Sequence, residues 1–456
     1  MSVSSFIDKI KSKNIKYNNV SSDTRTLKKG NIFFAIPGSK HNGSKFIKKA
    51  IKKDAAAIVV PNNYNGSFSN KIKFFKVKDI RKELSLSAFS INKNKIKTKI
   101  AITGTNGKTS VAFFLNYLLK NSGKKVAMIG TLGNSLSQKK NYNNLTSPEP
   151  INLSKQLKRL SSQNIEYLIM EASSHGLDQK RFFGLKFDIC ALTNISHDHL
   201  DYHKTMHNYI KSKMLLFSDY AHEQSKFIIN YETKNIKKIK SFFTKKNIIK
   251  PIYFQSNKNY KILKINNKND KQFVDILIEG RPISLTFKNF PDFQIKNFVF
   301  AVSILSLLGF NAEKLAKKSI NCPSVTGRME YIGRTKTGGL VYIDFAHTPD
   351  ALKNSIIETY KLKSSSIYVI FGCGGNRDQK KRPLMGKIAA KYADKVVVTD
   401  DNPRFENPAS IRKEIIGNLK NITEVGNRKL AIKRTIQSLK KGDLLLIAGK
   451  GHEKFQ

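Results

Sequence analysis

The stretch Ile100-Ala101-Ile102-Thr103-Gly104-Thr105-Asn106-Gly107-Lys108-Thr109-Ser110 decides the fold of the central part of this chain. It predicts a short apolar strand, a glycine turn and a helix, because apolar residues recur after position 110 with a period of 3.6 residues. Glycines free backbone N–H groups to face an anion, which the helix dipole and Lys108 attract. The hydroxyl of Thr109 or Ser110 would reach a magnesium ion on phosphates. We therefore expect a phosphate-binding loop of Gly104, Thr105, Asn106, Gly107, Lys108, Thr109 and Ser110, although its glycines are closer together than in the common loop.

The composition is that of a globular protein with an unusual excess of cations. The chain has 456 residues, of which 40% are hydrophobic, enough for two or three domains with their own cores. Its 82 Lys and Arg residues against 33 Asp and Glu give a formal charge of +49, a feature of many nucleic-acid-binding proteins. The lysines are spread along the whole chain, however, so we interpret them as a solvated surface that suits anionic substrates. We expect no nucleic-acid partner.

Cysteine usage and apolar runs favour a cytoplasmic protein. The cysteines at positions 190, 322 and 373 are isolated, so neither a disulfide framework nor a thiolate zinc site is expected. The first 20 residues hold no apolar signal segment, and the longest apolar run, 299–310, predicts a core helix. We expect a cytoplasmic monomer without membrane insertion.

Three parts with different patterns follow one another along the chain. Residues 1–92 contain strand-like runs at 32–36 and 55–60. From 93 to 322, strands and helices alternate, which favours a mostly parallel sheet with helices on both faces. From 323 to 456 a second α/β unit repeats this pattern. The predicted strands of the last two parts are 126–130, 167–170, 189–192, 227–230, 341–343, 367–371, 396–398 and 444–447.

Polar signatures directly follow the strands of the last part. They are 344–347, 372–382, 399–404 and 449–453. Ligands of open α/β sheets bind beyond the carboxyl ends of the strands. Four such strand ends in one unit therefore predict a substrate-binding face.

Two further motifs lie in the central part. Glu171 follows an apolar strand, where a magnesium-organising acid is expected, and its motif 171–181 offers donors for a sugar or diphosphate or, alternatively, a capped helix start. The motif 194–203 holds enough His and Asp for zinc, and His199, His203 and His207 would share one helical face. A metallohydrolase is thus an open alternative, but remote zinc partners are missing, and we retain only His199 as a metal-site residue.

Together with 327–330, these signatures resemble those of the Mur ligases, in the same order and over nearly the whole chain, and most closely those of the diaminopimelate-adding branch. The resemblance implies an N-terminal domain (1–92) for the uridine diphosphate substrate, a central P-loop ATPase (93–322) and a Rossmann-like C-terminal domain (323–456). It also implies a reaction of peptidoglycan precursor synthesis. ATP phosphorylates the D-glutamyl carboxylate of UDP-N-acetylmuramoyl-L-alanyl-D-glutamate, and the amine of meso-2,6-diaminopimelate attacks the acyl phosphate. The implied cofactors are ATP and Mg²⁺.

The resemblance further implies roles for individual residues. Catalysis is assigned to Lys108, Glu171, His199 and Lys213, and the metal to Thr109, Glu171, His199 and Lys213, the lysine as a carbamate whose oxygen suits magnesium. ATP is assigned to the phosphate-binding loop with Asn297, Arg328 and Asp344. The uridine-linked substrate is assigned to Ser22, Thr24, Ser39, Lys40, His41, Thr146, Ser147, Ser173, Gln179 and Arg181. Diaminopimelate is assigned to Arg377, Asp401, Asn402, Pro403, Arg404, Gly449 and Glu453.

The choice of amino acid is the sharpest of these implications. Arg404 resembles an arginine that lysine-adding relatives lack, and with Arg377 it would clamp the second carboxylate of diaminopimelate while Glu453 meets the distal ammonium. A few positions depart from the family pattern: Thr24 replaces a serine, Pro291 and Gln294 replace a glycine and an asparagine, and Phe345 replaces a tyrosine. The family also continues beyond the position of Gln456, so we expect the C-terminal domain to be shortened.

Overall fold

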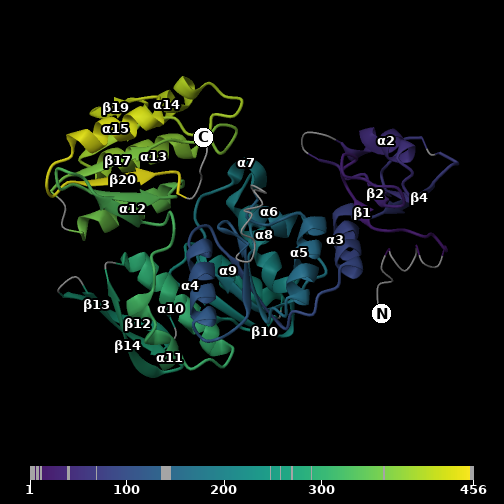
Figure 1. The fold of residues 1–456 in the computed structure, drawn as a ribbon, viewed down its shortest axis with the longest axis horizontal. Coiled ribbons are helices and arrows are strands. Elements are labelled where there is room, and N and C mark those ends of the chain that lie inside the picture. Colours follow the sequence, from purple (N-terminus) through teal and green to yellow (C-terminus); the bar gives the residue numbers. More distant parts are fainter. Residues whose placement is uncertain are drawn as a thin grey trace. The chain divides into compact units, whose positions relative to one another are not determined.

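The computed structural model describes residues 6, 10, 13–38, 42–67, 69–134, 145–246, 248–256, 258–268, 271–288, 290–362, 365–451 and 456. By its contacts the chain forms two compact units, Met1–Thr103 with Gly123–Ala191 and Ser212–Phe227, and Gly104–Ser122 with Leu192–Lys211 and Ile228–Gln456. The described strands form four sheets, three of them mostly parallel (Figure 1). The predicted α/β class is thus confirmed, whereas the domain boundaries at 92 and 322 stay predictions.

The first sheet is entirely parallel and is covered by helices on both faces. Its strands lie in the order β1 (Val20–Ser21), β2 (Ile32–Phe34), β3 (Ala57–Pro61) and β4 (Lys73–Val77). One face packs on α3 (Ile80–Ile91), and the other packs on α2 (Ile47–Lys52), which follows the short helix η1 (Gly43–Phe46). Burial on both faces explains why β2 and β3 read as continuous apolar runs.

The second sheet contains the strand of the predicted phosphate-binding loop. Its order is β11-β10-β9-β5-β8-β6-β7. Strand β5 (Thr98–Thr103) leads into helix α4 (Lys108–Lys120), as predicted. The other strands are β6 (Val126–Gly130), β7 (Gly133–Asn134), β8 (Tyr167–Glu171), β9 (Phe187–Leu192), β10 (Ala221–Asn230) and β11 (Ile252–Phe254), so every strand predicted between 100 and 230 occurs.

Helices connect these strands, and further helices follow the last of them along the chain. The connecting helices besides α4 are α5 (Pro150–Ser162), α6 (Ser174–Asp178), α7 (Leu200–His203), α8 (Met206–Ser218) and α9 (Ile236–Lys246), and the further ones are α10 (Asp292–Leu307), α11 (Ala312–Ala316) and η2 (Ser319–Asn321). Helix α10 is the predicted core helix and is buried along most of its length. Within the part of the chain that the structure describes, no helix is both long and apolar enough to cross a membrane.

A third sheet was not predicted. Strands β12 (Tyr260–Lys268), β13 (Lys271–Ile278) and β14 (Arg281–Lys288) are antiparallel and lie beside α10 and α11 (Figure 1). Val274, Ile276 and Ile278 point to the buried face. The segment that contains these strands is rich in lysine and asparagine at 264–271, so in the sequence it resembles a solvated loop.

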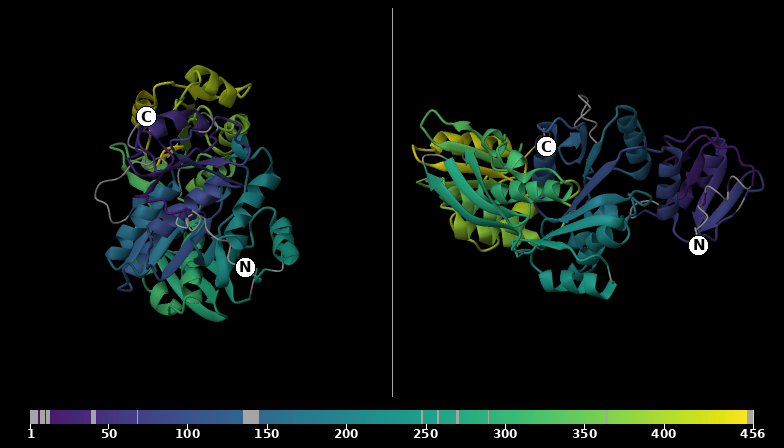
Figure 2. Two further views of the ribbon diagram at one scale, coloured as in Figure 1. Left: turned by 90° about the vertical axis from the view of Figure 1, so that its right-hand side faces the viewer. Right: turned by 90° about the horizontal axis from the view of Figure 1, so that it is seen from below.

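The fourth sheet has the order β15-β16-β20-β17-β18-β19, and only β15 is antiparallel. Its strands are β15 (Glu330–Arg334), β16 (Leu340–Asp344), β17 (Ile367–Phe371), β18 (Lys395–Val398), β19 (Ile422–Glu424) and β20 (Leu444–Ala448). Helices α12 (Pro349–Tyr360), α13 (Lys381–Tyr392) and α14 (Pro408–Ile416) pack on one face, and α15 (Arg428–Ser438) packs on the other (Figure 2). The carboxyl ends of β16, β20, β17 and β18 therefore lie side by side.

The burial of β20 gives a test of this sheet. Leu446 is fully buried among the helices of one face, whereas Leu430 on α15 is 38% exposed. We expect Leu446→Ala to lower the free energy of unfolding by about 2–5 kcal/mol, because the substitution leaves a cavity. Leu430→Ala should cost less than about 1 kcal/mol. Urea unfolding of both variants measures the difference, and equal losses would contradict the packing described.

Candidate functional site

The glycine loop between β5 and α4 has the geometry of a phosphate-binding loop. Gly104 and Gly107 have φ angles of +149° and +83°, and Gly107 caps α4. The Nζ of Lys108 donates to the carbonyl oxygens of Gly104 and Thr105, at 2.8 Å each. The lysine thus folds back over the loop, which places its charge beside the helix N-terminus.

A second segment fixes the backbone of this loop. Asn194 Oδ1 accepts from the N–H of Asn106 at 2.9 Å, and Thr193 Oγ1 donates to the carbonyl of Asn106 at 2.6 Å. The hydroxyl of Thr105 lies 3.0 Å from that of Tyr209, which is fully buried. The loop is therefore held rigidly before any ligand arrives. Thr193 and Tyr209 are residues that sequence reasoning missed, since they lie some 90 to 100 positions away.

The three residues predicted for the ATP base and ribose gather near this loop. A Cβ added at Gly107 would lie 3.0 Å from Asn297 Oδ1. Arg328 Nη2 lies 3.4 Å from the hydroxyl of Thr109, and its guanidinium stacks 4.3 Å above the centre of the Phe345 ring. The replacement of a tyrosine by Phe345 thus retains an aromatic platform for Arg328.

Asp344 is the third of them and is buried. Its two carboxylate oxygens accept from the backbone N–H groups of Met329 and Ala346, at 2.6 Å each. Burial raises the pKa of Asp344 above its usual range, although Arg328 and the two N–H donors oppose this. Because both carboxylate oxygens are hydrogen-bonded to backbone N–H groups, the Asp344 side chain fixes the loop that carries Arg328.

A buried carboxylate, Asp198, lies among two histidines and two lysines beside the glycine loop. It lies 3.3 Å from His199 Nε2 and 3.9 Å from His347 Nε2. Burial acts to raise the pKa of Asp198, but His199, His347, Lys381 and Lys108 lower it below its usual range. Burial, with help from Lys381, lowers the pKa of His347 to about 4, so this histidine is neutral at pH 7.

The histidines at 199, 203 and 207 do not share one helical face, and that prediction is wrong. His199 precedes α7 with a φ of +54°, and His203 ends α7. Lys204, with a φ of +66°, separates this helix from α8, which contains His207. Among the described side chains, no group of three or more His, Cys, Asp or Glu residues is placed to hold a metal ion.

Glu171 joins the predicted substrate residues in one hydrogen-bonded group. Its Oε1 accepts from the N–H of Thr131 at 2.8 Å, and the Thr131 hydroxyl lies 3.3 Å from that of Thr146. The Ser147 hydroxyl donates to the carbonyl of Glu171 at 2.9 Å and accepts from the N–H of Ser173 at 3.0 Å. Thr131, which follows β6, was missed by sequence reasoning.

Arg181 and Gln179 complete this group. Arg181 donates to the carbonyl of Ser147 at 2.7 Å and to Gln179 Oε1 at 2.7 and 3.2 Å, and it pairs with Glu149 at 3.0 Å. The Ser173 hydroxyl accepts from Gly176 and caps α6, as the alternative interpretation of this motif expected. Hydrogen bonds and an ion pair therefore join the segment 146–149 to the motif 171–181.

For the remaining predicted substrate and metal residues the structure gives mainly their burial. Ser22 is exposed and Thr24 is buried on the turn that follows β1. Ser39, Lys40, His41 and Glu453 lie outside the described residues. Lys213 on α8 is 1% exposed, in contrast to the surface lysines that its surroundings in the sequence suggest.

The residues predicted for diaminopimelate gather at the carboxyl ends of β17, β18 and β20. Arg404 Nη1 donates to the carbonyl of Gly375 at 2.8 Å, and its backbone φ is +55°. Burial lowers the pKa of Arg404, and the nearby charge of Arg377 lowers it further. A Cβ added at Gly449 would lie 3.6 Å from Asp401 Oδ2. Two guanidinium groups and one carboxylate thus line one edge of the sheet.

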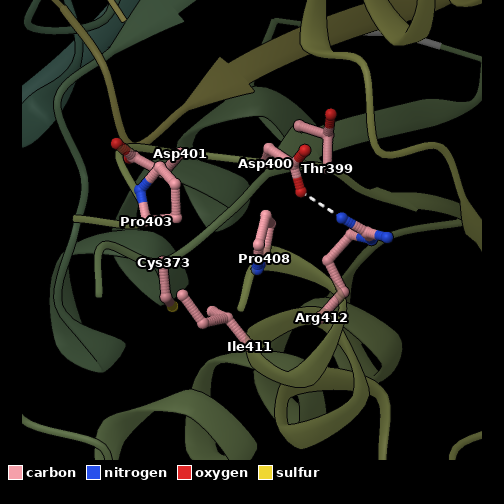
Figure 3. A pocket seen from close by; sticks show the side chains of 8 residues that line it. All are labelled: Cys373, Thr399, Asp400, Asp401, Pro403, Pro408, Ile411 and Arg412. Carbon is pink, nitrogen blue, oxygen red and sulfur yellow. Dashed lines mark hydrogen bonds and ion pairs between the residues drawn. The ribbon is translucent and has the colours of Figure 1, made fainter. Parts of the chain in front are cut away.

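A small pocket lies beside Asp401, in the segment that follows β18 (Figure 3). It is lined by Cys373, Thr399, Asp400, Asp401, Pro403, Pro408, Ile411 and Arg412. Inside it the side chain of Asp400 faces Arg412, which also donates to Glu424 at 2.6 Å. This pairing ties the end of β18 to α14 and β19.

The neighbouring loops are also joined by an ion pair between a buried arginine and a partly buried glutamate. Arg382 is fully buried, and its two terminal nitrogens donate to the two carboxylate oxygens of Glu406 at 2.8 and 2.9 Å. Hydrogen bonds from Arg382, and then from the N–H of Asn376, lower the pKa of Glu406 to about 2. The pair has the bidentate geometry of strong charge-assisted hydrogen bonds.

The fold and this loop define the class of the protein: it is an α/β protein with a P-loop for nucleotide phosphates. Family models match residues 16–82 (Mur ligase family, catalytic domain), 102–305 (Mur ligase middle domain) and 327–451 (Mur ligase, glutamate ligase domain). The chain belongs to the Mur ligase family.

Individual relatives support the same placement. The chain is 40% identical to the UDP-N-acetylmuramoyl-L-alanyl-D-glutamate–2,6-diaminopimelate ligase of Rickettsia bellii, over 96% of this chain and 91% of the relative. It is 36% identical to the enzyme of that name from Rhizobium meliloti, over 97% and 90%. A solved structure of such a ligase is similar with a TM-score of 0.67 at 27% identity, covering 96% of this chain and 91% of that one. A MurF ligase of Thermotoga maritima in complex with ADP shares the fold, with a TM-score of 0.64 at 17% identity over 96% and 95%.

The close packing at Gly104 gives a test of the glycine loop. A Cβ there would lie 1.9 Å from Thr193 Oγ1, whereas one at Gly123 meets nothing within 4 Å, and both glycines have positive φ. Both Ala variants place a side chain at a positive φ, but only Gly104→Ala also has to move the loop. We expect the Kd for ATP to rise at least about tenfold in Gly104→Ala. Gly123→Ala is the matched control, and calorimetric titration that gives equal Kd values for both would contradict the loop geometry.

The lowered pKa of Glu406 predicts a pH dependence of stability. Relative to an ordinary value of 4.5, a folded-state pKa of about 2 means that the contribution of Glu406 is complete above pH 4.5 and is lost as the pH falls through about 2. Between the wild type and Glu406→Gln, the free energy of unfolding should differ by about 1.5–3 kcal/mol at pH 7. Urea unfolding at pH 7, 4.5, 3 and 2 checks whether the difference shrinks only below pH 4.5. A difference in the free energy of unfolding that does not depend on pH would refute the lowered pKa of Glu406.

Proposed function

We propose that this chain is the ATP-dependent ligase that joins meso-2,6-diaminopimelate to the D-glutamyl carboxylate of UDP-N-acetylmuramoyl-L-alanyl-D-glutamate in peptidoglycan precursor synthesis. The family and relatives at 34–40% identity over most of the chain support this function. The observation that carries the amino-acid choice is the pair of loops that hold Arg377 and Arg404 at the carboxyl end of the fourth sheet.

The chemistry explains why a nucleotide is needed. A carboxylate is a poor electrophile, because attack on it would expel an oxide anion. Transfer of the γ-phosphoryl group of ATP to a carboxylate oxygen gives an acyl phosphate and ADP. The amine of diaminopimelate then adds to the acyl carbon, phosphate leaves, the amine loses a proton, and an amide bond remains.

The loop residues account for phosphoryl transfer. Backbone N–H groups of the glycine loop and the N-terminus of α4 would face the phosphates, and Lys108, already placed over the loop, would offset charge on the transferred group. Arg328, held on Phe345 beside Thr109, would add a second cation. These residues act by position and charge, as phosphoryl transfer requires.

We retain a magnesium ion as part of the proposal because of the chemistry of the predicted donors. The hydroxyl of Thr109 and the buried carboxylate of Glu171, which Thr131 orients, are hard oxygen donors of the kind that Mg²⁺ prefers. Such an ion would neutralise charge on the phosphate oxygens. We retain His199 and Lys213 as the further predicted ligands, the lysine as a carbamate, since a buried ammonium would repel the ion.

The selection of diaminopimelate follows from charge. Its second carboxylate can accept hydrogen bonds from both Arg377 and Arg404, whereas L-lysine has none and would leave both guanidinium groups unpaired in the bound complex. Both side chains are exposed in the structure, and the bound amino acid would cover them. The penalty for leaving a covered, hydrogen-bonded charge unpaired is about 2–5 kcal/mol.

Predictions about domains, oligomeric state, location and partners complete this proposal. We keep three domains with boundaries at 92 and 322, an N-terminal and central surface for the uridine-linked substrate, and a monomer. A cytoplasmic location agrees with the supply of ATP there. We propose no nucleic-acid partner, because the lysines are spread along the whole sequence.

Arg404 provides the test of this function. In an assay of phosphate release with the uridine-linked muramyl dipeptide and ATP, we expect diaminopimelate to support turnover and L-lysine to fail. Arg404→Ala should lower kcat/KM for diaminopimelate by a factor equivalent to about 2–5 kcal/mol, with the Kd for ATP unchanged. Arg434→Ala, on an exposed position of α15, is the control. Equal use of both amino acids, or an unchanged kcat/KM in Arg404→Ala, would contradict the assignment.

A further inference from the structure

The two loops that carry Arg377 and Arg404 lie outside helices and strands. The first, 374–379, follows β17, and the second, 402–406, follows β18. Both bring a guanidinium group to the same place, where like charges repel one another. When no carboxylate is bound, the loops therefore need another interaction that keeps them together.

Backbone contacts set the register of the loops at their near ends. Gly375 N donates to the carbonyl of Asn402 at 2.9 Å, and Phe405 N donates to Asn376 Oδ1 at 2.9 Å. A Cβ at Gly375 would lie 1.9 Å from the carbonyl oxygen of Pro403. The approach of the two backbones is thus as close as glycine allows.

The Arg382–Glu406 pair fixes the far ends. Arg382 lies in the first turn of α13, so its position is set by a helix. Besides its two bonds to Arg382, Glu406 accepts from the N–H of Asn376 and, at 3.4 Å, from Gln379 Nε2. Glu406 therefore binds both the first loop and the helix that follows it, from the end of the second loop.

We propose that the ion pair between the fully buried Arg382 and Glu406 is a positioning pair, which sets the spacing of Arg377 and Arg404 and thereby the affinity for the second carboxylate of the diamino acid. The proposal rests on the proposed function. Neither partner is assigned a contact with substrate, so both act through the loops they join.

The test compares two isosteric variants. Glu406→Gln removes the charge that binds Arg382. Glu414→Gln is the matched control, because Glu414 Oε2 accepts from the same nitrogen of Arg382 at 2.9 Å but, among the described contacts, reaches neither loop. In Glu406→Gln we expect the KM for diaminopimelate to rise about 10–100-fold, as for a small misplacement of binding groups. The kcat and the KM values for ATP and the muramyl dipeptide should stay within about twofold, and all parameters of Glu414→Gln should stay within that range.

A purely structural role gives a different pattern. Loss of folded enzyme lowers the apparent kcat with every substrate and leaves the KM for diaminopimelate unchanged, and that result in Glu406→Gln would overturn the proposal. An equal rise of this KM in Glu414→Gln would overturn it too.

Arg382→Lys provides a second test if Glu406→Gln does not fold. This variant keeps the positive charge but loses the two parallel hydrogen bonds to Glu406. It should raise the same KM selectively, and an unchanged KM counts against the pair. A wild-type enzyme that releases no phosphate with diaminopimelate would refute the proposed function itself. A wild-type enzyme that is active, with a KM insensitive to both substitutions, would refute only the positioning role.

Discussion

Sites for anions must collect cations and N–H donors in a small space, and those groups repel one another before the anion arrives. In this chain two carboxylates meet that constraint. The buried Asp198 lies near the charges of Lys381 and Lys108 beside the glycine loop, and Glu406 faces the fully buried Arg382 between the two loops of the fourth sheet. In a protein of formal charge +49, the placement of its few acids matters more than their number. The local geometry of both sites depends on these pairings.

The sheets supply the frame in which these pairings work. Parallel strands direct their carboxyl ends to one edge, so residues far apart in the sequence meet there. The order β16-β20-β17-β18 brings together the segments after positions 344, 448, 371 and 398. The strands are apolar and buried, whereas the loops beyond them carry the chemistry. The same division holds at β5, where an apolar strand ends in the glycine loop.

Local patterns made much of this predictable. Strands β5 and β8, and strands β16, β17, β18 and β20 of the fourth sheet, contain continuous apolar runs, and each ends at a polar motif that the sequence displays directly. The antiparallel sheet β12–β14 was missed because the end of β12 and the turn into β13 are rich in lysine and asparagine, which resembles a solvated loop. The single helical face proposed for His199, His203 and His207 was wrong because Lys204 adopts a positive φ that ends α7. Thr131, Tyr209 and Glu406 could not be found from the sequence, since their roles depend on partners brought close only by the fold.

The missing side chain at Gly375 has a consequence for protein engineering. Because the carbonyl of Pro403 occupies the space where a Cβ would stand, the segments on either side of this contact cannot be exchanged one at a time. Grafting 401–404 into a related scaffold would transfer the arginine without the surface that receives its backbone. A change of building block in such an enzyme would have to transplant both segments, with the start of α13, as one module.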